Sequence, residues 1–202
     1  MEKYKNKYRI PSTRLQNWDY RWAGSYFITI CTQNRVHYFG EIANGQMQLS
    51  HVGIIANILW YQIPYHSNNV ELGAFVVMPN HIHGILIIND NLVNTIETGH
   101  ALSLRYALSL QTFNETLTET SEQAIIIGQP RFQNIGKNSI SSIVGSYKSA
   151  VTKYANRLGF DFHWQNLFHD HIIRDDISFQ TISDYIINNP NNWVEDKFFN
   201  QE

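Results

Sequence analysis

Residues 71–90, ELGAFVVMPNHIHGILIIND, decide the fold that this sequence predicts. Two apolar runs, Val70–Met78 and Ile82–Ile88, flank the dipeptide Pro79-Asn80. A Pro-Asn pair between two apolar runs is typical of a turn between strands. The stretch is therefore predicted to be a β-hairpin, and the rest of the chain is interpreted outward from it.

Two histidines open the second strand of this hairpin. His81 and His83 are two residues apart, so the period of a strand puts both imidazoles on one face and sends Ile82 into the core. Two neutral imidazoles side by side form half of a divalent metal site. The alternative is two unrelated histidines on a solvent-facing strand. We favour the metal site because two histidines on an otherwise apolar strand indicate a polar function at that position.

Helical and strand periodicities on either side of the hairpin predict an α+β fold. The predicted elements are a strand over Ser25–Gln33, a small hairpin over Val36–Ser50 with its turn at Asn44-Gly45, a helix from His51 that Pro64 ends, strands over 70–78 and 81–89, a helix over Ser139–Leu158, a strand over Phe162–Arg174, and a last helix that Ser178 caps and that runs to Asn189 before Pro190. This order predicts a ferredoxin-like βαββαβ antiparallel sheet with helices on one face, plus a C-terminal helix.

The chain of 202 residues is long enough for one domain with its own core. We expect a basic, aromatic arm over 1–24, a single domain over 25–189 and a tail over 190–202. Within the domain, residues 90–136 repeat the sequence ALSL and are rich in polar residues, which predicts a flexible insert.

The net charge of −2 argues weakly against a nucleic-acid partner, but the charges are unevenly distributed. Residues 1–22 carry six basic and two acidic residues, whereas 90–134 carry two basic and five acidic ones. Lysines and arginines interleaved with tyrosines and tryptophans suit single-stranded nucleic acid. The alternative for the arm is a solvated tail whose aromatic side chains pack onto the domain.

Cys31 is the one cysteine, so we expect no disulfide and a reducing, cytoplasmic location. The sequence contains no apolar run of membrane-spanning length and no signal-peptide pattern at its start. We therefore expect a soluble protein without a membrane partner.

The segment FVVMPNHIHGILI closely resembles the HUH motif (His, bulky hydrophobe, His) of the IS200-like, single-tyrosine (Y1) transposases. The resemblance is greatest to the branch of REP-associated tyrosine transposases. Further blocks of that branch recur in the same order and cover most of the chain: NWDYRWAGSYFITICTQNR, FGEIANGQMQLSHVG, WQNLFHDHIIRDD and DYIINNPNNW.

This resemblance implies a ferredoxin-like catalytic domain that nicks and rejoins single-stranded, hairpin-bearing DNA. It implies that Tyr185 is the nucleophile, forming a 5′-phosphotyrosine link, and that Asn189 joins His81 and His83 as a metal ligand. Tyr185 and Asn189 are four residues apart, so a helix places them on one face. The expected cofactor is a divalent ion, Mg²⁺ or Mn²⁺. Because one nucleophile handles one strand at a time, we expect a homodimer.

Alternatives to these assignments stay open at this stage. Tyr147 or Tyr154 could be the nucleophile instead, and His169-Asp170-His171 repeats the spacing of the histidine pair. A domesticated hairpin-binding protein with weak or no catalysis is the alternative function, and a phosphodiesterase that uses water is a third. The candidate DNA-contacting residues are Lys3, Lys5, Lys7, Arg9, Arg14, Lys148 and Arg174.

Overall fold

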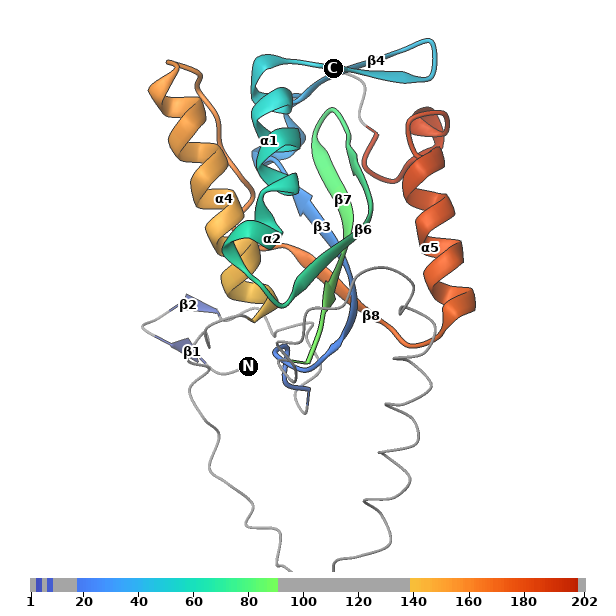
Figure 1. Cartoon of the computed structure of the whole chain (residues 1–202). Helices are drawn as coiled ribbons and strands as arrows, with labels where there is room; N and C mark the ends of the chain where they lie inside the picture. The colour runs from blue at the N-terminus through green and yellow to red at the C-terminus, as the bar shows by residue number, and fades with distance from the viewer. Residues whose placement is uncertain (1–2, 5–6, 9–17, 91–138, 200–202) are drawn as a thin grey trace, which may run out of the picture. The chain divides into compact units, whose positions relative to one another are not determined.

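The computed structural model describes residues 3–4, 7–8, 18–90 and 139–199. The strands and helices in chain order are β1 (Lys3–Tyr4), β2 (Lys7–Tyr8), β3 (Gly24–Cys31), the 3₁₀ turn η1 (Gln33–Arg35), β4 (Gly40–Ala43), β5 (Gln46–Leu49), α1 (His51–Tyr61), α2 (Ile63–His66), β6 (Val70–Val77), β7 (His81–Ile88), α4 (Ile140–Arg157), β8 (His169–Ile173), α5 (Asp176–Asn188) and η2 (Trp193–Glu195) (Figure 1). The predicted insert over 90–136 lies almost entirely outside the described residues, as does most of the predicted arm.

The central sheet has four strands in the order β6-β7-β3-β8, and every neighbouring pair is antiparallel. Chain order and sheet order together give the ferredoxin-like βαββαβ arrangement, so the predicted fold class is confirmed. The hairpin formed by β6 and β7 is the one predicted around Pro79-Asn80. β3 occupies the middle of the sheet, where its first residues pair with both β7 and β8.

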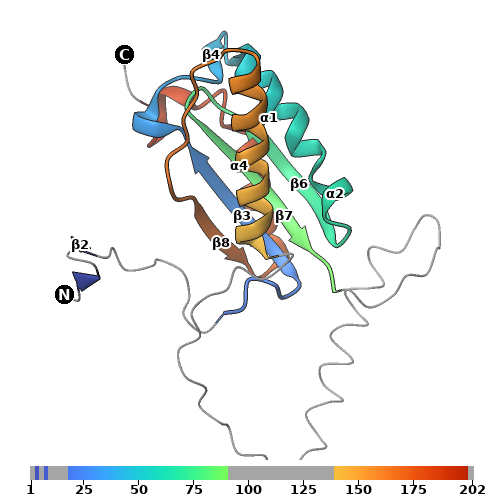
Figure 2. The same cartoon turned by 90° about the vertical axis from the view of Figure 1, so that its left-hand side faces the viewer.

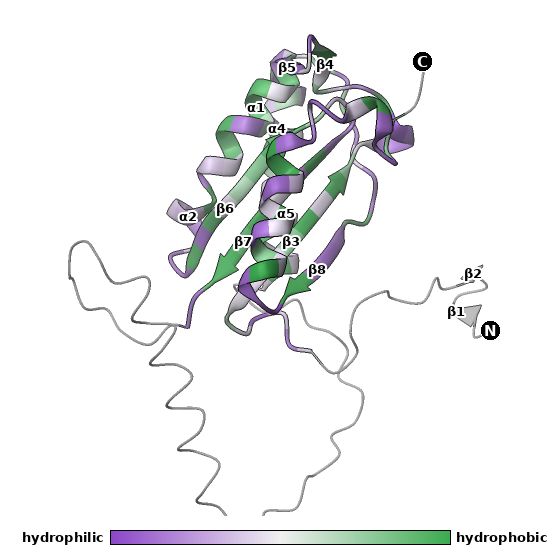
Figure 3. Cartoon of the chain, turned by 90° about the vertical axis from the view of Figure 1, so that its right-hand side faces the viewer, coloured by the Kyte–Doolittle hydropathy of each residue, from purple (hydrophilic) through white to green (hydrophobic). Residues whose placement is uncertain are grey.

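The two faces of the sheet are covered by different helices. α1 and α4 pack side by side on one face, and α5 covers the other (Figures 1 and 2). Alternate residues of β3 serve the two sides: Tyr26, Ile28 and Ile30 join the larger core with α1 and α4, whereas Phe27 packs with α5. Figure 3 shows α5 crossing strands that are largely hydrophobic. The α5 face also carries the histidine pair.

Helix α4 begins and ends as the sequence predicts. Ser139 is its N-cap, and its hydroxyl accepts a hydrogen bond from the Ser142 amide at 3.2 Å. Gly159 follows the helix with φ of +79°, which is the left-handed conformation that favours glycine after a helix. In the small hairpin, Asn44 and Gly45 have φ of 54° and 71°, as a tight turn between β4 and β5 requires.

The structure corrects three of the predicted boundaries. The strand predicted over Phe162–Arg174 is regular only in β8, because the aromatic residues before it pack into the core from an irregular segment instead of alternating along a strand. Pro64 does not end the helical region but lies in the first turn of α2, where its missing N–H is tolerated. Asp175, not Ser178, caps α5: its carboxylate accepts bonds from the Ser178 amide at 2.7 Å and hydroxyl at 2.9 Å.

A search of the described residues for a helix both long and apolar enough to cross a membrane finds none.

Candidate active site

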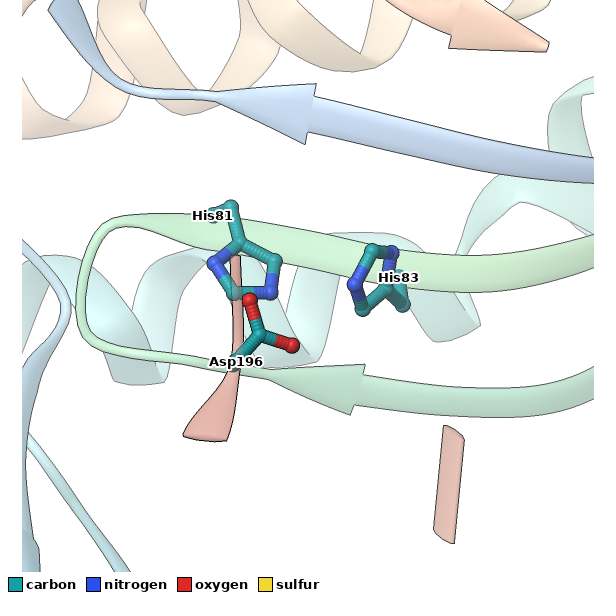
Figure 4. A group of neighbouring side chains, drawn as sticks. All are labelled: His81, His83 and Asp196. Atoms are coloured by element: carbon teal, nitrogen blue, oxygen red, sulfur yellow. The ribbon is translucent and has the colours of Figure 1, made fainter. Parts of the chain in front are cut away.

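Strand β7 holds His81 and His83 side by side on the α5 face of the sheet. β7 lies between β6 and β3, and the two side chains are 0% and 1% exposed. Their ring centroids are 4.4 Å apart. Figure 4 shows the two rings next to each other on the strand, facing Asp196. The predicted alternative, two histidines on a solvent-facing strand, is therefore wrong, because the strand is central and the face is covered.

A hydrogen bond to Nδ1 orients each imidazole. His81 Nδ1 lies 2.9 Å from Asn80 Oδ1, and His83 Nδ1 lies 2.9 Å from Thr29 Oγ1. Because an amide oxygen can only accept, His81 must donate through Nδ1, which leaves the lone pair on its Nε2. Asn80 is itself held by a bond from its Nδ2 to the Phe198 carbonyl at 2.9 Å. Partners of this kind fix ring orientation at metal sites.

Helix α5 brings Tyr185 and Asn189 to the histidines. The Tyr185 hydroxyl oxygen lies 3.2 Å from His83 Nε2. Asn189, one turn further along at the C-cap, is 1% exposed, and its Nδ2 donates to Asp196 Oδ2 at 2.9 Å. Tyr185 itself is 40% exposed, so the side chain lies at the surface of the site. The structure thus brings together, within one chain, all four residues that the sequence predicted for the site.

Asp196 is a residue of this site that the sequence analysis missed. Its Oδ2 accepts a hydrogen bond from the Tyr185 hydroxyl at 3.0 Å as well as the bond from Asn189. Its Oδ1 accepts from the Phe198 amide at 2.7 Å, which fixes the carboxylate. The Phe198 ring then packs on His81 with centroids 4.5 Å apart. No periodic pattern marks these residues, because they follow α5 in a short irregular segment and reach the site only through tertiary packing.

Burial sets the protonation state of the histidines. It lowers the pKa of His83 to about 3, although the charge of Asp196 opposes the shift. Burial and the neighbouring His83 hold the pKa of His81 well below 6.5, with smaller contributions from the charges of Arg35 and Lys197. Both imidazoles are therefore neutral at neutral pH, which is the form that binds metals.

The same surroundings keep Tyr185 protonated. Burial, followed by the charge and the hydrogen bond of Asp196, raises the pKa of Tyr185 to about 12. A phenol is a weak nucleophile, so a reaction through Tyr185 needs a local positive charge or a proton acceptor. Asp196 supplies the acceptor directly.

The donor atoms around this cluster fit a divalent cation. His81 Nε2 and Asn189 Oδ1 are buried and have no hydrogen-bond partner among the described residues. Leaving buried acceptors unsatisfied is costly unless something else binds them. One ligand atom each from His81, His83 and Asp196 lies within 4.8 Å of the other two. Two imidazole nitrogens with carboxylate and amide oxygens suit Mn²⁺, or Mg²⁺ with weaker preference.

The other predicted site residues lie elsewhere. Lys148 on α4 donates from Nζ to the Gln165 carbonyl at 2.6 Å and to the Asn166 carbonyl at 3.3 Å. Arg174 is exposed and forms no ion pair with the described residues. Lys5, Arg9 and Arg14 lie outside the described residues, and for Lys3 and Lys7 the structure describes only the backbone, in β1 and β2.

The competing tyrosines and histidines do not join the cluster. Tyr147 is buried in the core, where its hydroxyl donates to the Ala56 carbonyl at 2.9 Å. Tyr154 is exposed on α4, on the opposite face of the sheet from α5. His169 pairs with Thr29 across the sheet and so shares the face of His83, but it is exposed on the edge strand.

Comparison with known proteins identifies a relative of nearly full length. An uncharacterized protein of Haemophilus influenzae is 34% identical over 189 residues, which cover 93% of this chain and 92% of that protein. The chain belongs to the family of this Haemophilus protein. No protein-family model matches the chain.

Two solved structures are similar to the chain. One is a REP-associated tyrosine transposase bound to a REP hairpin, at 18% identity and a TM-score of 0.48, covering 96% of this chain and 74% of that one. The other, from Deinococcus radiodurans R1, is described provisionally as a transposase, at 13% identity and a TM-score of 0.36, covering 90% and 97%.

Proposed function

We propose that this protein is a metal-dependent, transposase-like enzyme that nicks and rejoins single-stranded DNA through a covalent bond to Tyr185. The observation that carries the proposal is the position of the Tyr185 hydroxyl, 3.2 Å from His83 Nε2 and 3.0 Å from Asp196 Oδ2. A half-exposed tyrosine at a cluster of neutral imidazoles and unsatisfied acceptors suits nucleophilic attack on a phosphodiester.

His81, His83 and Asn189 are the residues that would hold the cation, with the Asp196 carboxylate beside them. When bound, a divalent ion supplies positive charge that polarises the scissile phosphate and favours the phenolate. Asn80 and Thr29 keep the imidazoles in the orientation that this role needs.

In the nicking step, Tyr185 Oη attacks the phosphorus. A bond forms between phosphorus and Oη while the bond from phosphorus to the 3′ oxygen of the preceding nucleotide breaks. The phenol proton passes to Asp196 Oδ2, and the departing 3′ oxygen takes up a proton from solvent to give a free 3′-OH. The products are a 5′-phosphotyrosine and a 3′-OH end.

Rejoining reverses the exchange. A 3′-OH attacks the phosphotyrosine and loses its proton to solvent, the bond from phosphorus to Oη breaks, and the phenol recovers its proton from Asp196. The covalent link conserves the energy of the original phosphodiester, so no nucleotide triphosphate is required. The expected homodimer is proposed only because two DNA ends need two nucleophiles.

A covalent adduct is the direct test of this function. Purified protein is incubated with Mn²⁺ and a mixture of hairpin-bearing single strands labelled at their 3′ ends, then run on a denaturing gel. Label should move with the protein, because the 5′ phosphate of the 3′ fragment is the group that is transferred. Tyr185→Phe and His81→Ala should abolish this band, whereas Tyr154→Phe should retain it.

Three outcomes would redirect the assignment. Hairpin binding without an adduct in any divalent ion would favour the domesticated binding protein. Multiple turnovers of cleavage without an adduct would favour a phosphodiesterase that uses water, and an adduct in Tyr185→Phe would exclude Tyr185 as the nucleophile.

A further inference from the structure

A hollow of about 400 Å³ lies beside α4, on the opposite face of the sheet from the histidine cluster. It is lined by Lys148, Ser149, Thr152, Lys153 and Trp164. The first four come from successive turns of α4, and Trp164 comes from the irregular segment before β8. The function proposed above gives none of these residues a role, although the sequence predicted Lys148 as a DNA-contacting residue.

The indole of Trp164 is held rigidly in this hollow. Its Nε1 donates to the Lys148 carbonyl at 3.1 Å, and its ring packs edge-on against Phe162 with centroids 4.8 Å apart. The bonds from Lys148 Nζ to the carbonyls of Gln165 and Asn166 fasten the same segment to α4. The ring is nevertheless only half-buried. A fixed aromatic surface that is partly exposed can stack with a planar ligand at little cost in conformational entropy.

The charge around the hollow is positive. α4 carries three basic residues, Lys148, Lys153 and Arg157, and no acidic one. Lys153 is exposed, and its ammonium group forms no hydrogen bond or ion pair with the described residues. With the hydroxyls of Ser149 and Thr152, the lining offers cations and donors for phosphate beside an aromatic face for a base. This combination is typical of sites for single-stranded nucleic acid.

The hollow lies on the opposite face of the sheet from the catalytic cluster, but the two are linked through neighbouring strands. The Gln165 amide donates to the Cys31 carbonyl at 2.9 Å, and Cys31 is the residue of β3 that pairs with His81. Neighbouring strands are about 4.8 Å apart, so the backbone next to Trp164 lies roughly 10 Å from that of His81.

We propose that this hollow is a nucleotide subsite, in which one base of the single strand flanking the scissile phosphate stacks on Trp164 while Lys153 binds an adjacent phosphate. The subsite rests on the function proposed above and extends it. Because the cluster and the hollow lie on opposite faces of the sheet, a strand bound to both would have to cross the sheet edge at 163–165. Stacking is largely independent of base identity. The subsite therefore increases the affinity for the strand and fixes which nucleotide lies at the cluster, but it does not select a base sequence.

Binding of fluorescein-labelled oligo(dT) tests the subsite without catalysis. The protein is the full chain carrying Tyr185→Phe, in buffer with a chelator, and anisotropy is measured across a series of salt concentrations. Lys153→Gln should weaken binding by about fivefold and reduce the salt slope by about 0.7, the value for one phosphate contact to a single strand. The matched control is Arg157→Gln on the same helix: both cations lie 6.0 Å from the Tyr154 ring, but Arg157 does not line the hollow.

A second measurement follows Trp164 itself. Oligo(dT) should quench the intrinsic fluorescence of the Tyr185→Phe protein, and a substantial part of that quenching should disappear when Trp164→Phe is added. Equal weakening by Lys153→Gln and Arg157→Gln, no weakening by either, or quenching unchanged by Trp164→Phe would each overturn the subsite while DNA binding stands. No binding of oligo(dT) by the protein that retains Trp164 and Lys153 would overturn the subsite, whereas failure of the proposed function would appear separately as the absence of the covalent adduct with hairpin-bearing strands.

Discussion

Substitution of Gly84 by alanine tests the packing that holds the histidine strand in place. Gly84 follows His83 in β7, and a Cβ atom there would lie 2.3 Å from Cζ2 of Trp60 on α1. Ordinary contact begins at 3.4 Å, so the indole would have to retreat by about 1.1 Å. It has little room to do so, because Trp60 is fully buried and stacks on Phe75 with centroids 4.6 Å apart.

Overpacking of this kind costs about 1–3 kcal/mol. Replacing glycine by alanine also reduces the conformational freedom of the unfolded chain. Where the folded backbone permits alanine, this stabilises the protein by roughly 0.4–1 kcal/mol. We therefore expect Gly84→Ala to lower the free energy of unfolding by about 1.3 kcal/mol, the difference between these two terms. The assay is urea unfolding followed by circular dichroism, which does not depend on the emission of Trp60.

Gly145→Ala is the matched control. Gly145 is exposed within α4, and a Cβ there would meet nothing within 4 Å. Alanine is preferred over glycine in a helix by about 1 kcal/mol, so this variant should be more stable than the wild type. If Gly84→Ala were as stable as the wild type, the account of how α1 packs against β7 would be refuted.

Three further predictions concern the site. In the unfolded chain each histidine takes up a proton as the pH falls through 6.5, whereas in the folded protein His83 stays neutral down to its pKa of about 3. The contribution of the buried histidines to the free energy of unfolding should therefore be complete above pH 6.5 and should fall below it by about 1.4 kcal/mol per pH unit for each of them. Urea titrations of the wild type and of His83→Gln measure this slope. Mn²⁺ should raise the melting temperature of the wild type but not of His81→Gln, because only the wild type binds it tightly in the folded state. Asp196→Asn should lower the pKa of Tyr185 from about 12, because the charge and the hydrogen bond of the carboxylate both raise it. Alkaline titration of the tyrosine absorbance, with Tyr185→Phe as the reference that identifies the Tyr185 signal, measures this pKa. An unchanged pKa in Asp196→Asn would show that the contact is absent.

The parts of this fold that the sequence predicts are those with a local, periodic cause. The alternation around Pro79-Asn80 predicts the β6–β7 hairpin, and the spacing of His81 and His83 predicts their common face. The four-residue spacing of Tyr185 and Asn189 predicts that they project together once α5 is placed. These features are local in the chain, so no tertiary information is required to find them.

The parts that it does not predict depend on contacts between distant segments. Phe162 and Trp164 alternate like strand residues, but their rings fill an aromatic cluster with Phe39, which keeps this segment irregular. Asp196 reaches Tyr185 only because the chain turns back after α5 and Phe198 packs over His81. The buried state of the histidines likewise follows from the sheet order and from α5, which no local pattern encodes.

The most direct test of the central claim is to identify the residue that carries the DNA. The protein is incubated with Mn²⁺ and hairpin-bearing single strands, the DNA is trimmed with nuclease, and the peptides are analysed by mass spectrometry. Our account predicts a nucleotide linked through its 5′ phosphate to Tyr185 and to no other tyrosine. A nucleotide on another residue, such as Tyr154, or cleaved DNA with no modified peptide, would contradict it.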